Sequence, residues 1–353
     1  MPNVRTLLAL GAIAAATRVQ AQTPSSASGY VALLLPENVN PRWEGQDGRF
    51  FVQAMKQLAP NVKVDVFNAN NDVSTQQRQA EQAVTKGAKA IVIAPIDGKA
   101  AAVIADEDHQ AGVPTLAYDR MIQSPYTDFW VQASMPGVGR AQAQAVVDHT
   151  KDGDTIVMLK GSPTDPNAAL IFQGQMDLMK PLFDSGKRKL GYESWVQGWD
   201  PAIARREMDQ ALTKLNNNVQ GVIASNDGNA AAAVASLAEQ GLAGKVAVSS
   251  LDATVQSLQL ILLGEQTQTT WRPFQQMAHT TAEVVVALLD HGDIKTLVSG
   301  TATNLVGAKV PFVEVPFYSI EGTQGVSFVI EHDPSVTKAA VCTGAASKTQ
   351  FCQ

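Results

Sequence analysis

Apolar segments of strand length alternate with helical segments along most of the chain, and this alternation restricts the possible folds most. The apolar runs at residues 30–35 and 113–118 are continuous, which is typical of strands buried on both faces. Helical segments such as 42–58, 99–111 and 201–215 lie between the strands; the second ends before a glycine and the third begins with proline. This order predicts parallel sheets with helices on both faces.

The alternation occurs in two runs of about five strand–helix units, which predicts two similar α/β domains. A late apolar helix opens at Pro273, and residues 310–320 and 326–330 are expected to be mostly extended. These late elements must join sheets that began earlier in the chain. We therefore expect the chain to cross between the domains more than once and to form a hinge over a cleft.

The N-terminus has the layout of a secretory signal peptide. Arg5 supplies a positive charge, residues 7–16 are apolar, and Val19-Gln20-Ala21 places small residues at the cleavage positions. Cleavage is expected after Ala21, which predicts an exported protein, although an amphipathic first helix is the alternative. The apolar run is shorter than the roughly 20 residues of a membrane span.

Composition and cysteine use limit the partners. The net charge is -6 and the sequence pI is near 5.4, whereas binding of nucleic acid requires a basic face. The only cysteines, Cys342 and Cys352, lie in the tail, and an even count in an exported protein predicts a disulfide. A metal site is disfavoured because the cysteines and the distant His332 do not form a ligand pattern. No cofactor is expected.

Polar residues follow the apolar strands, at the positions where ligands bind in open α/β sheets. Asp119 and Arg120 come directly after the strand at 113–118. The other candidates are Arg42, Trp43, Asp165, Asn167, Trp199, Asn226, Asp227, Asp252 and Arg272. Each one alone is compatible with an ordinary turn or helix cap.

Together these residues favour an uncharged ligand with many hydroxyl groups. Carboxylates accept from hydroxyls, guanidinium groups donate to them, amides do both, and indoles offer a flat face to a sugar ring. None of the histidines falls at a strand end, and no nucleophile elbow, phosphate loop or metal spacing is present. A glycosidase using Asp119 and Asp227 as acid and base remains an alternative.

Several motifs resemble those of the D-xylose-binding periplasmic proteins of ABC sugar importers. They are Ala-Tyr-Asp-Arg-Met-Ile (117–122), Gly-Ser-Pro-x-Asp-x-Asn-Ala (161–168), Gly-Trp-x-Pro (198–201), Ala-Ser-Asn-Asp (224–227), Gln-Gly-Leu-Ala-Gly-Lys-Val-Ala (240–247) and Asp-Ala (252–253). The resemblance covers about residues 29–320 and excludes the tail. It implies two Rossmann-like lobes with parallel sheets, three crossing segments, an aldopyranose in the cleft and docking of the closed form on a membrane permease.

The resemblance also implies boundaries and residue roles. The N-terminal lobe is expected at 29–133 plus 273–305 and the C-terminal lobe at 134–272 plus 306–330, between a flexible lead-in (22–28) and a tail (331–353). Trp43 and Trp199 would stack on the sugar ring, while Asp165 and Asp227 would be near contacts or supports. The implied sugar contacts are Arg42, Asp119, Arg120, Asn167, Asn226 and Asp252.

Two departures from the family pattern bear on specificity. Arg272 stands where the family usually has Lys, and Ala133-Ser134-Met135-Pro136 replaces Phe-Asp-Asn near the first crossing. D-xylose is the first expectation and glucose the second, with the chain acting as a monomer. A sugar-acting enzyme such as a glycosidase or isomerase would also fit the motifs, as would a receptor that reports to a sensor kinase or chemoreceptor. A sugar-sensing repressor would need a helix-turn-helix before the first strand.

Overall fold

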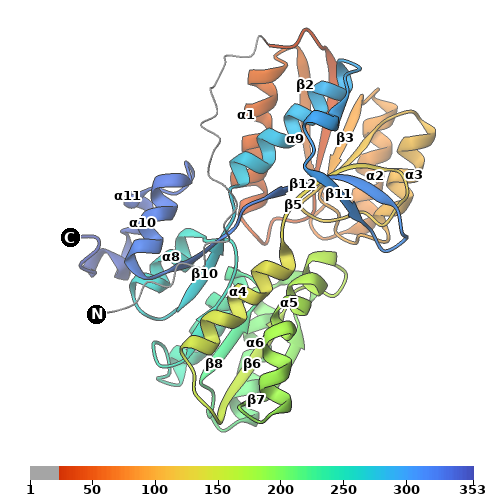
Figure 1. Ribbon diagram of the computed structural model, residues 1–353. Helices are drawn as coiled ribbons and strands as arrows, with labels where there is room; N and C mark the ends of the chain where they lie inside the picture. Colours follow the sequence, from red (N-terminus) through yellow and green to blue (C-terminus); the bar gives the residue numbers. More distant parts are fainter. Residues whose placement is uncertain (1–23) are drawn as a thin grey trace.

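The computed structural model describes residues 24–353, which form two α/β lobes connected by three crossing segments (Figure 1). The expected signal peptide therefore lies outside the described residues. The N-terminal lobe is built on a seven-stranded sheet in the order β11-β12-β5-β4-β3-β1-β2. Its strands are β1 (Gly29–Leu35), β2 (Val62–Asn68), β3 (Ala90–Ile93), β4 (Thr115–Tyr118), β5 (Thr127–Ala133), β11 (Gly300–Thr303) and β12 (Lys309–Val315).

The C-terminal lobe is built on a six-stranded sheet in the order β13-β10-β9-β8-β6-β7. Neighbouring strands in both sheets are parallel, except that β11 runs antiparallel to β12 and β13 antiparallel to β10. The predicted fold class of two Rossmann-like lobes is confirmed. The strands are β6 (Asp154–Lys160), β7 (Arg188–Trp195), β8 (Gly221–Ala224), β9 (Ala247–Ser249), β10 (Gln268–Trp271) and β13 (Tyr318–Glu321).

Helices cover the faces of both sheets. In the first lobe they are η1 (Trp43–Gly48), α1 (Arg49–Leu58), α2 (Val73–Thr85), α3 (Ala101–Gln110), α9 (Phe274–Leu289) and η3 (Ile294–Thr296). In the second lobe they are α4 (Met135–Asp148), α5 (Pro166–Asp184), η2 (Gln197–Trp199), α6 (Pro201–Lys214), α7 (Asp227–Glu239) and α8 (Val255–Leu262). One helix was expected from Arg42 to Leu58, but the structure begins this segment with a π-helical turn, η1, before α1.

The third crossing segment lies later than expected. The first crossing segment lies between β5 and α4, next to the expected boundary at 133/134. The second lies between β10 and α9, next to the expected boundary at 272/273. The expected boundary at 305/306 is wrong, because β12 pairs in parallel with β5, with Phe312 opposite Trp130. The chain therefore crosses between Val315 and Tyr318, where Pro316 interrupts the extended segment.

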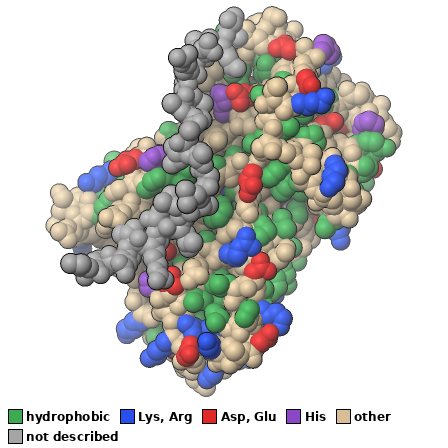
Figure 2. Space-filling view, in the orientation of Figure 1, with side chains coloured by type: hydrophobic (Ala, Val, Ile, Leu, Met, Phe, Trp, Pro, Cys, Tyr) green, Lys and Arg blue, Asp and Glu red, His purple; other side chains and the backbone are tan. Residues whose placement is uncertain are grey.

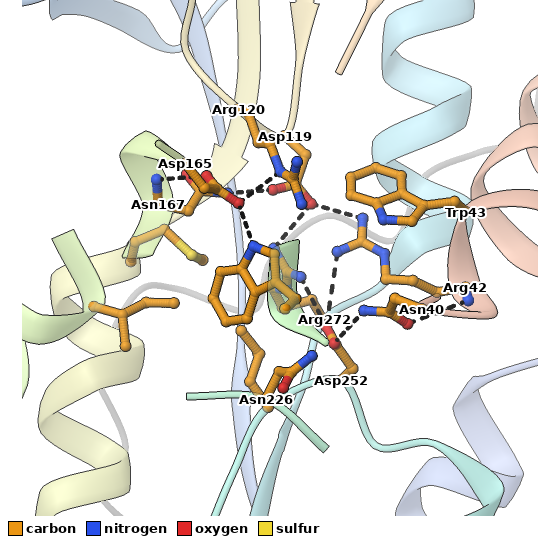
Figure 3. A pocket seen from close by; sticks show the side chains of 14 residues that line it. Asn40, Arg42, Trp43, Asp119, Arg120, Asp165, Asn167, Asn226, Asp252 and Arg272 are labelled. Atoms are coloured by element: carbon orange, nitrogen blue, oxygen red, sulfur yellow. Dashed lines mark hydrogen bonds and ion pairs between the residues drawn. The ribbon is translucent and has the colours of Figure 1, made fainter. Parts of the chain in front are cut away.

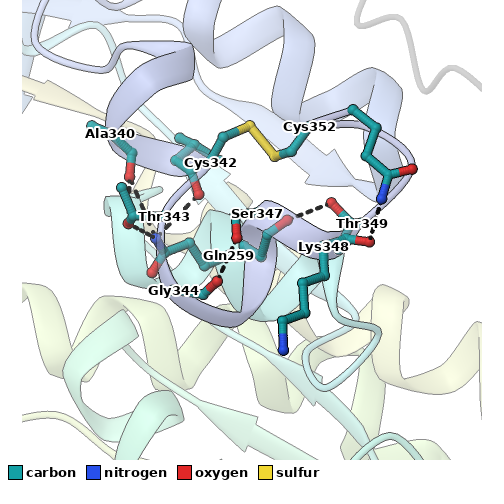
Figure 4. The surroundings of a disulfide bond; sticks show 12 residues. Gln259, Ala340, Cys342, Thr343, Gly344, Ser347, Lys348, Thr349 and Cys352 are labelled. Atoms are coloured by element: carbon teal, nitrogen blue, oxygen red, sulfur yellow. Dashed lines mark hydrogen bonds between the residues drawn. A yellow bond between two sulfur atoms is a disulfide. The ribbon is translucent and has the colours of Figure 1, made fainter.

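The tail is part of the second lobe and contains helices. Residues 326–330 were expected to be extended, but they belong to α10 (Gly322–His332), because helical spacing buries Val326 and Val329 together in one apolar cluster. α11 (Lys338–Val341) and η4 (Gly344–Lys348) follow. Cys342 and Cys352 form the predicted disulfide (Figure 4). Val336, Val341 and Phe351 of the tail pack in the same cluster as Leu258 of α8.

Residues 24–28 are held in place rather than forming a free linker. The Ser25 amide donates to the Leu58 carbonyl at 2.7 Å, and its hydroxyl donates to Asp290 at 2.8 Å. In residues 24–353 no helix has the length and apolar character to cross a membrane. On the face shown in Figure 2, Lys and Arg side chains are interspersed with Asp and Glu side chains over both lobes.

Candidate ligand-binding site

A cavity lies between the lobes at the carboxyl ends of the strands (Figure 3). Ten of the eleven residues predicted for the site line it, and Asp227 does not. The lining residues are Asn40, Arg42, Trp43, Asp119, Arg120, Met135, Asp165, Asn167, Ile171, Trp199, Asn226, Leu251, Asp252 and Arg272. They come from loops and helix starts of both lobes, so the site exists only when the lobes face each other.

Asp119 is the centre of the charged network. Its carboxylate lies 2.6 Å from Arg42 Nη2 and 3.2 Å from Arg272 Nη1, and it accepts from Asn167 Nδ2 at 2.5 Å. Burial by itself would raise the pKa of Asp119. The guanidinium groups of Arg42, Arg272 and Arg120 outweigh this effect and hold its pKa well below the usual range. Asp119 is therefore ionised at neutral pH.

The π-helical turn η1 positions Arg42. Asp47 accepts from Arg42 Nε at 2.8 Å and from Nη2 at 2.9 Å, and the Tyr118 hydroxyl donates to Asp47 at 2.6 Å. Arg42 and Asp47 are five positions apart, and a π-helical turn brings residues at this spacing onto one face. Sequence reasoning missed Asp47 because an ordinary α-helix was assumed there. A carboxylate five residues after Arg42 was the only available signal.

Arg120 and Asp165 connect the two lobes directly. Arg120 Nε lies 2.7 Å from Asp165 Oδ2, and Trp199 Nε1 donates to the same oxygen at 2.9 Å. Asp165 also caps α5 by accepting from the Asn167 amide at 2.9 Å. Burial raises the pKa of Asp165, and the charge of Arg120 opposes that effect. The ion pair joins the end of β4 to the beginning of α5, across the cleft.

Asp252 connects the lobes on the other side of the cavity. It lies 3.0 Å from Arg272 Nη2 and 3.7 Å from Arg42 Nη1, and it accepts from Asn40 Nδ2 at 2.9 Å. Asp119, Trp199 and Asp252 all have positive φ, of 64°, 58° and 113°. Such conformations are unfavourable for residues other than glycine, and they concentrate at functional sites.

Both predicted tryptophans line the cavity, but their surroundings differ. Trp43 donates from Nε1 to Glu37 at 2.5 Å, and the Arg42 guanidinium carbon lies 4.2 Å from its ring centroid. The Trp199 ring packs over Gly161. A Cβ added at Gly161 would come within 2.1 Å of that ring, so only glycine leaves room for it. The position of the Trp199 indole therefore depends on a close approach to the backbone of Gly161.

Asp227 faces the interior of the second lobe rather than the cavity. Its carboxylate accepts from the hydroxyls of Ser250 and Thr269 and from the amide and hydroxyl of Thr254. All of these donors belong to the same lobe. Burial, together with the nearby charge of Asp252, raises the pKa of Asp227 to about 6. Asp227 therefore does not line the cavity, and of the two roles expected for it, near contact or support, these bonds fit the support of the loop that carries Asp252.

Two buried polar atoms of the lining have no hydrogen-bond partner among residues 24–353. Asn167 Oδ1 is an unused acceptor, and Arg272 Nε is an unused donor. Buried polar groups are normally hydrogen-bonded, so both atoms indicate a ligand that supplies a donor and an acceptor. A hydroxyl group supplies both. The lining contains three arginines and three aspartates, which favours a ligand without net charge.

Further residues of the site were not predicted. The Asn40 side-chain amide donates a hydrogen bond to Asp252. Gln132 Nε2 donates to Asp119 at 2.6 Å, and Gln132 Oε1 accepts from Arg272 at 3.0 Å. Gln132 lies within β5 and gave no sign of function beyond being a polar residue in an apolar strand. Met135, Ile171 and Leu251 supply an apolar wall. Within residues 24–353, His, Cys, Asp and Glu side chains form no group of three arranged to hold a metal ion.

Two α/β lobes that enclose a cavity of balanced charges define a ligand-binding protein of the two-lobe class. The chain belongs to the periplasmic binding protein domain family, whose model matches residues 31–293. It is 40% identical to the D-xylose-binding periplasmic protein of Escherichia coli (strain K12), over 70% of this chain and 74% of that protein.

Further relatives agree with this membership. The multiple sugar-binding periplasmic receptor ChvE of Rhizobium radiobacter is 32% identical, over 82% of this chain and 86% of that protein. An ABC transporter solute binding protein from Clostridium phytofermentans, solved with bound β-D-glucose, has a TM-score of 0.80 at 23% identity. That comparison covers 88% of this chain and 99% of the other and supports the fold. The chain is a binding protein rather than an enzyme, as these relatives are.

Proposed function

We propose that this chain is the periplasmic substrate-binding protein of an ABC importer and that it binds an aldopyranose, with D-xylose as the first candidate and glucose as the second. The choice of D-xylose follows from the 40% identical relative that carries this sugar in its name. Delivery to a membrane permease is part of the same proposal. Action as a monomer, export and cleavage after Ala21 are also proposed.

One observation carries the proposal most strongly: two side-chain atoms without a hydrogen-bond partner in the described part of the chain, the acceptor Asn167 Oδ1 and the donor Arg272 Nε, lie in the lining of one cavity. A pyranose presents several hydroxyls on a small ring and satisfies both atoms at once. Hydroxyls bonded to the ionised Asp119 or to a guanidinium gain more than a neutral pair does. The indoles of Trp43 and Trp199 offer apolar faces for the C–H side of the ring.

The experiment is calorimetric titration of the purified protein with D-xylose, glucose, arabinose and ribose. We expect D-xylose to bind more tightly than the others. In Asn167→Ala, which removes the unpartnered acceptor, we expect the Kd to rise about tenfold or more, because a hydrogen-bonding group of the cavity is lost. Asn229→Ala is the matched control, since Asn229 is also buried and unpartnered among the described residues but does not line the cavity.

The control should bind sugar as the unaltered protein does. Absence of heat for every sugar would contradict the proposed function. Equal weakening by Asn167→Ala and Asn229→Ala would mean that this cavity is not the binding site.

A further inference from the structure

One hydrogen bond joins the C-terminal tail to the opposite lobe. Gln46 Nε2 donates to Ser335 Oγ at 2.5 Å. Gln46 belongs to η1 of the N-terminal lobe, and Ser335 follows α10 in the C-terminal lobe. Because the two residues belong to different lobes, this bond must break when the lobes move apart.

Ser335 is held firmly on its own lobe. Its amide and hydroxyl donate to Asp333 Oδ1 at 2.9 and 2.5 Å, and Trp271 Nε1 donates to Asp333 Oδ2 at 2.9 Å. Asp333 is buried, and Trp271 directly precedes the cavity residue Arg272. The hydroxyl of Ser335 therefore has a defined position relative to the second crossing segment.

The tail as a whole is attached to α8 (Figure 4). Gln259 Nε2 of α8 donates to the carbonyl of Val341 at 3.1 Å and to the hydroxyl of Thr343 at 2.8 Å. The Cys342–Cys352 disulfide closes the last turns of the chain, next to these bonds. Val336 and Val341 are buried against α8. The tail thus belongs to the same rigid lobe as α8.

The bond spans a groove that adjoins the ligand cavity. Gln46 and Ser335 lie in the lining of this interlobe groove. Four residues line both the groove and the cavity, namely Asn40, Arg42, Trp199 and Asn226. A bond across the groove therefore holds the two lobes together beside the cavity.

We propose that Gln46 and Ser335 form a latch between the lobes that stabilises the closed form and slows ligand release, which makes the C-terminal tail a determinant of affinity. The inference rests on the proposed sugar binding. An interaction present only in the closed form favours the ligand-bound state, because the ligand also requires closure. One neutral hydrogen bond corresponds to a change of about two- to tenfold in Kd.

The test compares Ser335→Ala, Gln46→Ala and the double variant with the unaltered protein. Calorimetry gives the Kd for D-xylose, stopped-flow fluorescence gives the release rate, and thermal unfolding without sugar gives the Tm. Ser347→Ala is the matched control, because the Ser347 hydroxyl donates to the Gly344 carbonyl within the tail and makes no bond to the opposite lobe in the described part of the chain.

We expect each single variant to raise the Kd and the release rate about two- to tenfold. The sugar-free Tm should be unchanged in Gln46→Ala and slightly lower in Ser335→Ala, because Ser335→Ala also removes the hydroxyl bond to Asp333 within its own lobe. The double variant should weaken binding no more than either single variant, because both remove the same bond. The control should match the unaltered protein. The latch would be overturned by an unchanged Kd in Ser335→Ala, whether or not the sugar-free Tm falls. Additive effects of the two substitutions in the double variant would overturn it as well. Failure of the unaltered protein to bind any sugar would instead refute the proposed function.

Discussion

At the scale of single residues, the site depends on charges that neutralise one another away from water. Asp119, Asp165 and Asp252 are buried, and each faces at least one guanidinium group. Removing one partner of such a pair leaves an uncompensated buried charge, which is more costly than the pair is favourable. A simple Asp119→Ala substitution is therefore expected to reduce stability as well as binding.

Arg272→Lys tests the departure from the family pattern. The Arg272 guanidinium contacts Asp119 and Gln132 through Nη1 and Asp252 through Nη2. A single ammonium cannot reproduce this fork. We expect the free energy of unfolding to fall by about 2 kcal/mol and the Kd for D-xylose to rise about tenfold. Urea unfolding and calorimetry measure these effects. In the control Arg205→Lys, at an exposed ion pair, both values should barely change.

Asp108 should make stability depend on pH. Its side chain is 2% exposed and accepts from the Thr115 hydroxyl at 2.8 Å, and within residues 24–353 no cation forms an ion pair with it. Burial first, and then the charges of Glu107 and Asp128, raise its pKa to about 7. Because this pKa lies above that of the unfolded chain, the stabilising contribution is present below about pH 4 and is lost as the pH rises through 7.

We therefore expect Asp108→Asn to unfold with a free energy about 2 kcal/mol higher than the unaltered protein at pH 8. The asparagine oxygen still accepts from Thr115 and carries no charge. The difference should shrink steadily when urea unfolding is repeated towards pH 4. A difference that does not depend on pH would contradict the assignment of the titrating group.

At the scale of elements, close packing of α4 against α5 places the apolar wall of the cavity. Met135 is the first residue of α4, and Ile171 lies in α5. A Cβ at Gly139 would come within 2.0 Å of the Ile171 carbonyl oxygen, and a Cβ at Gly174 within 2.0 Å of the Pro136 carbonyl oxygen. The helices can approach this closely only because both positions are glycine.

Gly139→Ala should therefore push the helices apart. We expect a loss of about 1–3 kcal/mol in the free energy of unfolding, as for other overpacked cores, and weaker sugar binding because Ile171 moves. Gly300→Ala is the control, since a Cβ there has no neighbour within 4 Å among the described residues and its backbone conformation is ordinary. Thermal unfolding of both variants decides between packing and a general effect of glycine replacement.

At the scale of the whole molecule, the ion pair of Arg120 and Asp165 links lobe closure to binding. We expect Arg120 to reach water when the lobes open, so that loss of the Asp165 charge destabilises mainly the closed form. Asp165→Asn should retain the cap of α5 while removing this pair. We expect the Kd to rise at least tenfold, because truncating one side of a buried charge pair costs about 2–5 kcal/mol.

X-ray scattering with increasing sugar should show that Asp165→Asn becomes compact only at higher sugar concentration than the unaltered protein. Asp200→Asn is the matched control: Asp200 caps α6 in the same lobe, accepting from the Ala202 amide at 2.8 Å, and within residues 24–353 it forms no pair across the cleft. Equal behaviour of the two variants would mean that the ion pair does not contribute to closure.

The amino-acid sequence by itself determined the class of fold and most of the site. Alternation of continuous apolar strands with helices favours parallel α/β layers, and residues that follow parallel strands in such layers meet at one edge. This reasoning placed ten cavity residues, from Arg42 to Arg272, with no knowledge of distances. The local sequence pattern was sufficient to place these residues, because it shows where each strand ends and which polar residues follow it.

Only the tertiary structure decided which partners these residues have. Three features depend on contacts between distant segments: the bond of Asp47 to Tyr118, the pairing of β12 with β5, and the packing of Val326 and Val329 against α8. Asp227 turns towards Ser250 and Thr269 for the same reason, because the donors that surround it come from neighbouring strands. Burial and pairing are properties of the packed molecule, so periodicity along the chain cannot specify them.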